Sequence, residues 1–174
     1  MIDDTTNQQI ADGLKEFKPG FLPYPIFEQV ARLVALPIIE FVPLRELGGR
    51  IQILLIRRPD NDPIFPAMEH TPGTVIRATD LESGNHNNWP AFDRILHDEL
   101  LDTNVGQPHY AGSMFHASKR GAEQAQIYWI EVLGEPKVGR FYDNDDLPYG
   151  LMESQTKFIK LAVQSFTNHD NQGL

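Results

Sequence analysis

Two adjacent carboxylates, Asp98 and Glu99, stand near the end of the segment A-F-D-R-I-L-H-D-E-L-L-D, residues 91 to 102. A helix turns by about 100° per residue, and at that spacing the segment places an apolar stripe on one side. The stripe consists of Phe92, Ile95, Leu96 and Leu100. Glu99 falls at the margin of this stripe, four residues after Ile95. Because burial of an unpaired carboxylate is costly, we expect Glu99 to have a cationic partner.

The partner of Glu99 can be of two kinds. One is a structural ion pair with Arg94, Arg77 or another cation, since charged residues often border apolar stripes. The other is a divalent cation, because two neighbouring carboxylates offer the hard oxygen ligands that Mg²⁺ prefers. The pattern of the helix alone does not favour one partner over the other.

The elements that must position this helix are mixed strands and helices. Apolar residues at helical spacing follow Pro25 and predict a helix there, and two strands flank a turn at Gly48 and Gly49. Pro43 suggests that the first of these strands lies at a sheet edge or carries a bulge. We expect a short strand after H-T-P-G, a strand at 126–133, a loop at 141–148 and a closing helix at 151–166. This order predicts an α+β protein, or an α/β/α sandwich around a mixed sheet.

Length and composition predict a single domain. With 174 residues, we expect an N-terminal arm at 1–20, one domain at 21–167 and a flexible tail at 168–174. A net charge of −9 argues against a nucleic-acid partner. The absence of cysteine excludes disulfides and thiolate metal sites. The acidic N-terminus is no secretory signal, and no apolar run reaches the roughly 20 residues that span a membrane. We therefore expect a cytoplasmic protein without membrane contact.

Residues 72 to 102 resemble a degenerate Nudix box. The family pattern runs from a glycine after a strand, through five residues, to a glutamate, and continues on a helix as R-E-U-x-E-E-x-G-U, where U is bulky and aliphatic. In this sequence P-G-T replaces the usual Pro-Gly-Gly, and Asp80 occupies the position of the loop glutamate. Arg94 matches the arginine, and Asp98 and Glu99 match the glutamate pair.

Three departures from the box are visible. Ile95 replaces the glutamate that supplies a metal ligand or the catalytic base in many members, Leu101 replaces the glycine, and the link from Asp80 to Arg94 is six residues longer than the family spacing. GDP-mannose mannosyl hydrolases also carry a hydrophobic residue after the arginine, in a segment F-E-R-L-x-x-x-E-L that F-D-R-I-L-H-D-E-L resembles. Their catalytic histidine belongs to a later loop, which here carries Asp143, Asp145 and Asp146 instead.

The resemblance covers roughly residues 36 to 167 and implies a Nudix-type α/β/α sandwich. It implies Mg²⁺-dependent, or Mn²⁺-dependent, hydrolysis of a nucleoside diphosphate linked to another group, such as a nucleotide sugar. Glu99, Asp98 and Asp80 would be metal ligands, and Glu99, Asp98 and Arg94 would form the catalytic set, with Arg94 orienting its neighbours. The alternative is a catalytically impaired Nudix-fold module that binds a nucleotide or has a regulatory role.

Other residues are candidates for substrate contact. Arg57 and Arg58 end a strand, so that only one of them can face a site, and Arg77 follows the box glycine region. These three arginines are the candidates for phosphate binding. His86 and His116 are candidate bases, and Trp89 and Tyr142 are candidate stacking residues. By analogy with family members, the N-terminal arm is expected to pack on a partner subunit in a homodimer.

Overall fold

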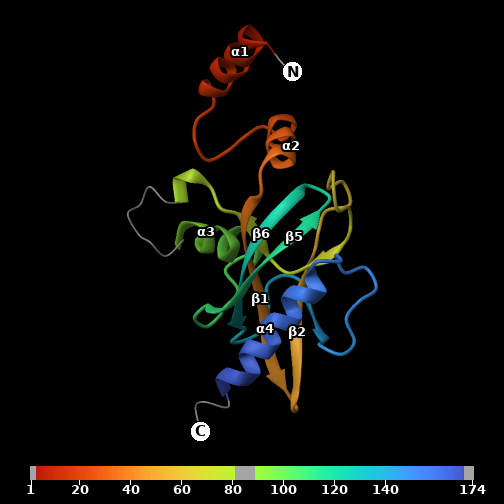
Figure 1. The fold of residues 1–174 in the computed structure, drawn as a ribbon. Helices are drawn as coiled ribbons and strands as arrows, with labels where there is room; N and C mark the ends of the chain where they lie inside the picture. The colour runs from red at the N-terminus through yellow and green to blue at the C-terminus, as the bar shows by residue number, and fades with distance from the viewer. Residues whose placement is uncertain (1–2, 81–88, 171–174) are drawn as a thin grey trace.

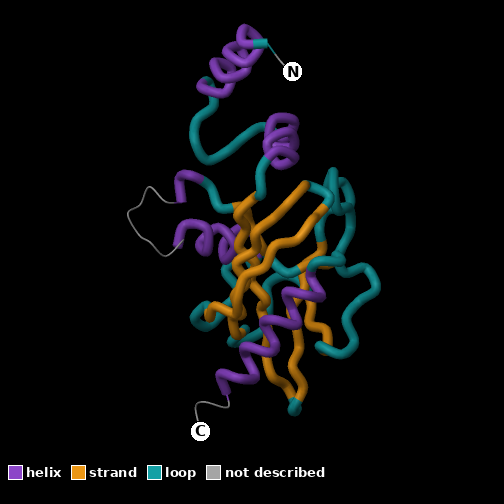
Figure 2. The backbone as a smooth tube through the Cα atoms, viewed as in Figure 1, coloured by secondary structure: helices purple, strands orange, loops and turns teal. Residues whose placement is uncertain are grey.

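The computed structural model describes residues 3–80 and 89–170 (Figure 1). In these residues, a mixed sheet is covered by helices on both faces (Figure 2). The helices are α1 (Asp4–Lys15), α2 (Tyr24–Leu33), α3 (Trp89–Arg94) and α4 (Gln155–Asp170). The strands are β1 (Leu36–Leu47), β2 (Arg50–Arg57), β3 (Glu69–His70), β4 (Gly73–Val75), β5 (His109–Ser118), β6 (Gly121–Glu131) and β7 (Arg140–Asp143).

The sheet runs in the order β3-β2-β1-β6-β5, with β4 paired to β1 and β7 paired to β2. The pair β1–β6 is parallel, and the other pairs are antiparallel. The predicted mixed sheet is therefore confirmed. The predicted hairpin is confirmed as well: Gly48 and Gly49 have φ angles of 61° and 75°, the positive values that a tight two-residue hairpin turn requires.

The strand β1 that contains Pro43 lies in the middle of the sheet, so of the two predicted alternatives, an edge strand or a bulge, the edge strand was wrong. On one side, β1 pairs with β6 continuously through Pro43. On the other side, β1 pairs with β4 at 38–40 and with β2 only from Leu44 onward. Pro43 thus stands in the gap between two ladders, where its missing N–H leaves no ladder hydrogen bond unmade.

The two faces of the sheet carry separate apolar cores. Ile38, Val42 and Leu44 of β1 belong to a core with Phe158, Ile159, Ala162 and Phe166 of α4. Ile39 and Phe41 of the same strand belong to a core with Phe92 and Ile95 on the opposite face. This alternation follows from the two-residue period of a strand. It confirms the predicted α/β/α sandwich.

The predicted helix at 90–102 ends earlier, in a π-helical turn at Ile95–Glu99. The amide of Leu100 donates to the carbonyl oxygen of Ile95, five residues back, at 3.0 Å. The wider turn changes the direction of Glu99 relative to a regular helix. After it, Leu101 and Asp102 have φ angles of 50° and 56°. Leu101 therefore adopts the left-handed conformation that the box glycine would adopt without strain.

Several elements differ from the sequence expectation. α1 lies within the predicted arm, has no buried residue and projects away from the sheet in Figure 1. β5 was not predicted, because it contains Gly112 and one of its faces is exposed to solvent. β7 replaces part of the predicted loop at 141–148, and α4 includes three residues of the predicted tail. No helix in the described part of the chain is long and apolar enough to cross a membrane.

Candidate functional site

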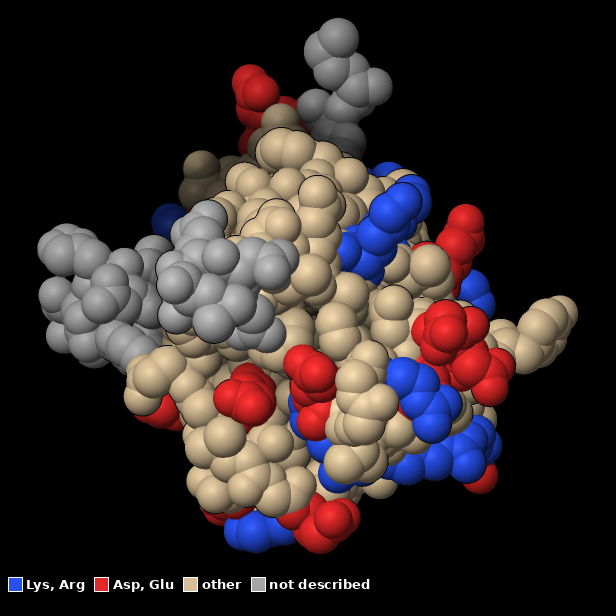
Figure 3. Space-filling model, turned by 90° about the horizontal axis from the view of Figure 1, so that it is seen from below, with Lys and Arg blue, Asp and Glu red and all other residues tan. Residues whose placement is uncertain are grey.

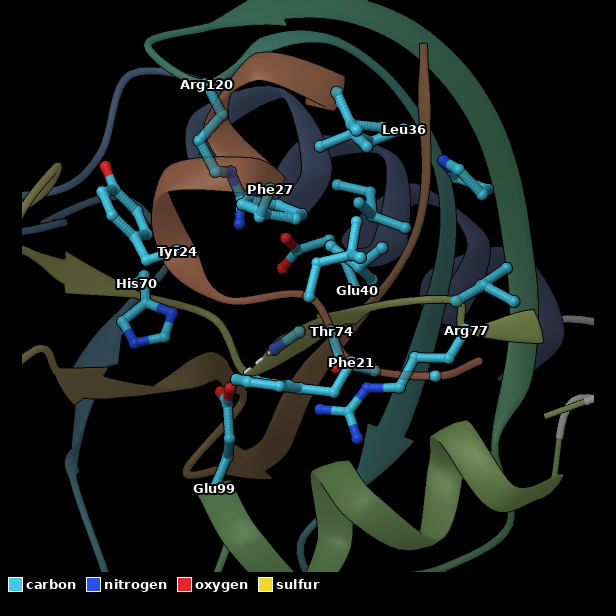
Figure 4. Close-up of a pocket in the computed structure, with 18 of the residues that line it drawn as sticks. Phe21, Tyr24, Phe27, Leu36, Glu40, His70, Thr74, Arg77, Glu99 and Arg120 are labelled. Atoms are coloured by element: carbon cyan, nitrogen blue, oxygen red, sulfur yellow. Dashed lines mark hydrogen bonds between the residues drawn. The ribbon is translucent and has the colours of Figure 1, made fainter. Parts of the chain in front are cut away.

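A cavity of about 590 Å³ opens where β1 and β4 meet the segment before β1 (Figure 4). Its lining combines aromatic residues, three arginines and two glutamates. Its lining includes Phe21, Tyr24, Phe27, Glu40, Arg58, His70, Gly73, Arg77, Glu99, Arg120 and Gln155. The site is therefore suited to a ligand that has an apolar part and negative charge.

Glu99 reaches this cavity from the π-helical turn. One of its oxygens, Oε2, accepts a hydrogen bond from the amide of Gly73 at 3.1 Å. The other oxygen has no hydrogen-bond partner among the described residues. Burial raises the pKa of Glu99 to about 7, although the Gly73 amide and the charge of Arg58 oppose the rise. Glu99 thus retains an oxygen for a ligand, a proton or a metal ion.

A second carboxyl group, that of Glu40, lies at the same place. A Cβ atom added to Gly73 would come within 2.5–2.7 Å of the Glu40 carboxyl atoms, so a larger residue at this position would require the Glu40 carboxyl group to move. Burial raises the pKa of Glu40 to about 8, and the charge of Glu99 adds to the rise. Glu40 was not among the sequence-predicted site residues, although a lone glutamate in the apolar run I-I-E-F-V was a visible signal.

Glu40 is linked to α4 through Thr71 and Gln155. The Thr71 amide donates to Gln155 Oε1 at 3.0 Å, which identifies that atom as an acceptor. The Thr71 hydroxyl contacts both Gln155 Oε1 and Glu40 Oε2, the latter at 3.0 Å. One hydroxyl proton serves only one of these two oxygens. A protonated Glu40 that donates to Thr71 satisfies the whole chain of bonds, in agreement with its raised pKa.

Asp80 and Asp98 do not join Glu99 in the cavity. Asp80 is 1% exposed and accepts hydrogen bonds from the Arg94 guanidinium and from the Arg77 amide, the latter at 2.7 Å. Asp98 is exposed and does not line the cavity. Within 3–80 and 89–170, no group of three His, Asp or Glu residues is placed to hold a metal ion. Of the three predicted ligands, the structure brings Glu99 alone to the cavity.

Arg94 connects the box loop to the helix. Its guanidinium donates to Asp80, to the carbonyl oxygen of Val75 at 3.1 Å and to that of Pro90 at 3.4 Å. Burial raises the pKa of Asp80, but the hydrogen bonds from Arg94 and from the Arg77 amide outweigh that effect and leave the pKa below its usual value. Arg94 therefore holds the strand and loop that carry Gly73 in place, and it does not contact the cavity itself.

The predicted phosphate-binding arginines separate into two groups. Arg58 and Arg77 line the cavity, whereas Arg57 is exposed and pairs with Asp60 at 3.2 Å. Arg58 also pairs with Asp62 at 2.8 Å. Arg120 lines the cavity too and was missed, because it lies in the turn between β5 and β6, far from the box in sequence.

His70 lines the cavity, although it was not among the sequence-predicted histidines. His70 Nδ1 lies 2.7 Å from the Thr71 carbonyl oxygen, which only accepts, so Nδ1 carries the proton and Nε2 is an acceptor. Burial lowers the pKa of His70 to about 4, so the ring is neutral. His116 pairs with Glu123 at 2.9 Å outside this cavity. His86 and the side chain of Trp89 lie outside the described residues, and Tyr142 does not line the cavity.

The two cavity glutamates can supply only part of the coordination shell of a divalent cation. Mg²⁺ is commonly held by one or two carboxylates together with substrate phosphates, and it needs no cage made only of protein ligands. Glu99 offers a free oxygen, and Glu40 lies beside it against Gly73. Two neighbouring carboxyl groups with raised pKa values are also the situation that a bound cation relieves.

Comparison of the sequence with models of protein families and with curated proteins gives no match. Comparison with solved structures gives several. The chain is similar to the NUDIX domain of Shewanella oneidensis NrtR complexed with ADP ribose, with a TM-score of 0.55 at 15% identity. That match covers 90% of this chain and 97% of the other.

Two further structures agree. A mutT/nudix family protein from Listeria innocua matches with a TM-score of 0.57 at 15% identity, over 79% of this chain and 97% of the other. The Ap4A hydrolase of C. elegans matches with a TM-score of 0.54 at 12% identity, over 78% and 98%. The topology, the box helix and these likenesses lead to one conclusion: this chain has the Nudix fold.

Proposed function

We propose that this protein hydrolyses a nucleoside diphosphate linked to another group, with Mg²⁺ or Mn²⁺. The observation that carries the proposal is the position of Glu99, which keeps a free oxygen in a cavity lined by Arg58, Arg77 and Arg120. The arginines match the charge of a diphosphate, and the neighbouring aromatic residues match a nucleoside. The similar structures support this class of ligand, since one is complexed with ADP ribose and another is an Ap4A hydrolase.

In this proposal, the chain's own residues bind the diphosphate, and one proton of the attacking water ends on the leaving oxygen. The arginines hold the phosphate oxygens, and water attacks phosphorus while the bond from phosphorus to the leaving oxygen breaks. Glu99 and Glu40 would hold the metal ion together with the phosphates, and the ion would neutralise their charge. The metal should bind well only when the diphosphate is present, because the protein supplies two carboxylates at most in the cavity.

A second function, nucleotide binding without catalysis, is favoured by Ile95. This residue is fully buried in the core that also contains Phe41 and Phe92, in the position of the glutamate that many family members use. Asp98, the other half of the acidic pair, lies outside the cavity. Substitution Ile95→Glu is not a fair test of lost activity, because it would place a charge in the core and destabilise the fold.

The test is turnover of nucleoside diphosphates, nucleotide sugars and ADP-ribose, measured with Mg²⁺, with Mn²⁺ and with a chelator. The wild type is compared with Glu99→Gln and with Asp98→Asn, an adjacent change outside the cavity. We expect metal-dependent turnover that falls at least about a hundredfold in Glu99→Gln. A drop of less than about tenfold is expected in Asp98→Asn.

Binding measured on the same panel separates the two functions. Nucleotide binding without turnover of any compound would reject hydrolysis and support the binding module. Turnover that survives in Glu99→Gln would place catalysis at other residues.

The exclusion of nucleic acid as a partner remains a proposal. On the face visible in Figure 3, basic and acidic side chains are interspersed, in keeping with the net charge of −9. A nucleic-acid partner would require a continuous basic surface.

A further inference from the structure

The segment from Gly20 to Val34 forms one wall of the cavity. Phe21, Tyr24 and Phe27 line it, and Figure 4 shows all three bordering the space around Glu40. The side chain of Phe21 is 72% exposed. A large aromatic ring that lines a cavity and is mostly open to solvent offers its face to a ligand.

Two glycines allow this wall to pack closely against the domain. Gly20 has a φ of +105°, and a Cβ atom there would lie 2.8 Å from Thr79 Oγ1. Gly121 has a φ of +139°, and its Cβ would lie 2.4 Å from the carbonyl oxygen of Ala31. The backbone of the segment therefore comes into close contact with the domain on both sides of the aromatic residues. Phe21 is therefore part of a surface that is held against the domain by backbone packing, although it precedes the sheet in sequence.

A positive charge lies beside the exposed ring. The guanidinium carbon of Arg77 is 6.0 Å from the centroid of Phe21. The Arg77 side chain has no ion pair or hydrogen bond with any other residue that the structure describes. A planar apolar surface next to an arginine is complementary to a flat ring that carries phosphate. A purely apolar ligand would leave the Arg77 side chain desolvated without a partner.

We propose that Phe21 is the stacking surface for the base of the ligand and that Arg77 binds the phosphate next to the nucleoside. The assignment rests on the proposed function, because it places the parts of a nucleoside diphosphate derivative within the same cavity. It also orients the ligand: the base lies on the N-terminal wall, and the diphosphate extends from Arg77 toward Glu99. The two residues then recognise different chemical parts of one ligand.

Titration calorimetry without metal tests this division. The probes are ADP, GDP, CDP, UDP and inorganic pyrophosphate, and the proteins are the wild type, Phe21→Leu and Arg77→Gln. Phe21→Leu keeps an apolar side chain but removes the aromatic face. We expect it to raise the Kd of the tightest nucleotide by about 5- to 150-fold and to leave the Kd of pyrophosphate unchanged. Arg77→Gln should raise the Kd of both probes by about tenfold.

The control is Phe115→Leu, because Phe115 is 75% exposed but does not line this cavity. It should change no Kd. Unchanged nucleotide affinity in Phe21→Leu, or an equal loss for pyrophosphate, would overturn the base subsite while the proposed function stands. A wild type that binds none of the five probes would overturn the subsite as well, whereas the proposed function is rejected only when the metal-dependent turnover assay detects no hydrolysis. Equal unfolding temperatures of the variants confirm that the fold is intact.

Discussion

Asp80 and Glu99 are carboxylates of the same box, and their surroundings are opposite, since Asp80 is buried and Glu99 is partly exposed at the cavity. The carboxylate oxygens of Asp80 accept hydrogen bonds from the Arg94 guanidinium and the Arg77 amide, and these bonds keep its pKa low. Glu99 accepts one bond from Gly73, faces the cavity, and has a raised pKa because of burial. A carboxylate whose oxygens all accept hydrogen bonds from the protein stabilises the fold, whereas one with an unpaired oxygen can bind a ligand. The comparison predicts that changes at these positions affect different properties.

The largest effect on stability is expected for Asp80→Ala. The change leaves Arg94 buried without its partner, so we expect the free energy of unfolding to fall by about 3–5 kcal/mol. Denaturant unfolding at pH 7 measures it, with Glu99→Gln as the matched change. Because a glutamine at 99 can still accept from Gly73, we expect less than about 1 kcal/mol there. Equal losses in the two variants would remove the distinction between a structural and a ligand-binding carboxylate.

A pH-dependent effect of intermediate size is expected at Glu40. Its pKa is about 8 in the folded protein, whereas an ordinary glutamate has a pKa of 4.5, so between these values the folded state holds a proton that the unfolded state has lost. Stability should therefore fall as pH rises through this window, by up to about 1.4 kcal/mol per pH unit. Glu40→Gln should reduce this slope, since an amide donates to Thr71 without titrating.

Unfolding free energies measured from pH 4.5 to 8.5 provide the check. Glu131→Gln is the control, because Glu131 is exposed on β6 and its loss should leave the slope unchanged. Part of the slope below pH 7 should persist in Glu40→Gln, because Glu99 also has a raised pKa. A profile identical to that of the wild type would mean that Glu40 is ionised in the folded protein.

The smallest effect is expected at Leu101, between the site and the surface. This residue has a φ of 50° and is 49% exposed, so glycine would relieve backbone strain at little cost in packing. We expect Leu101→Gly to raise the free energy of unfolding by up to about 1 kcal/mol. Thermal unfolding measures the change, and nucleotide affinity should not alter. A loss of stability would mean that the Leu101 side chain contributes more by packing than its backbone conformation costs.

The sequence alone determined the local elements and the type of fold. Apolar residues at helical spacing indicated the box helix and much of α4, and Gly48 and Gly49 indicated the hairpin. These signals could be used because they depend on residues that are close along the chain. The acidic pair and its box context led to Glu99. The exposed, glycine-containing strand β5 and the charged strand β7 gave no comparable signal, since their partners determine them.

The tertiary structure decided which of these residues meet. The register of β1 against β4 sets Glu40 opposite Gly73, and the π-helical turn brings Glu99 to the same glycine. The ion pair of Asp80 with Arg94 removes Asp80 from the cavity, and the close contacts of Gly20 and Gly121 add Phe21 to it. None of these contacts follows from local spacing, because each joins segments that the chain separates and only packing brings together.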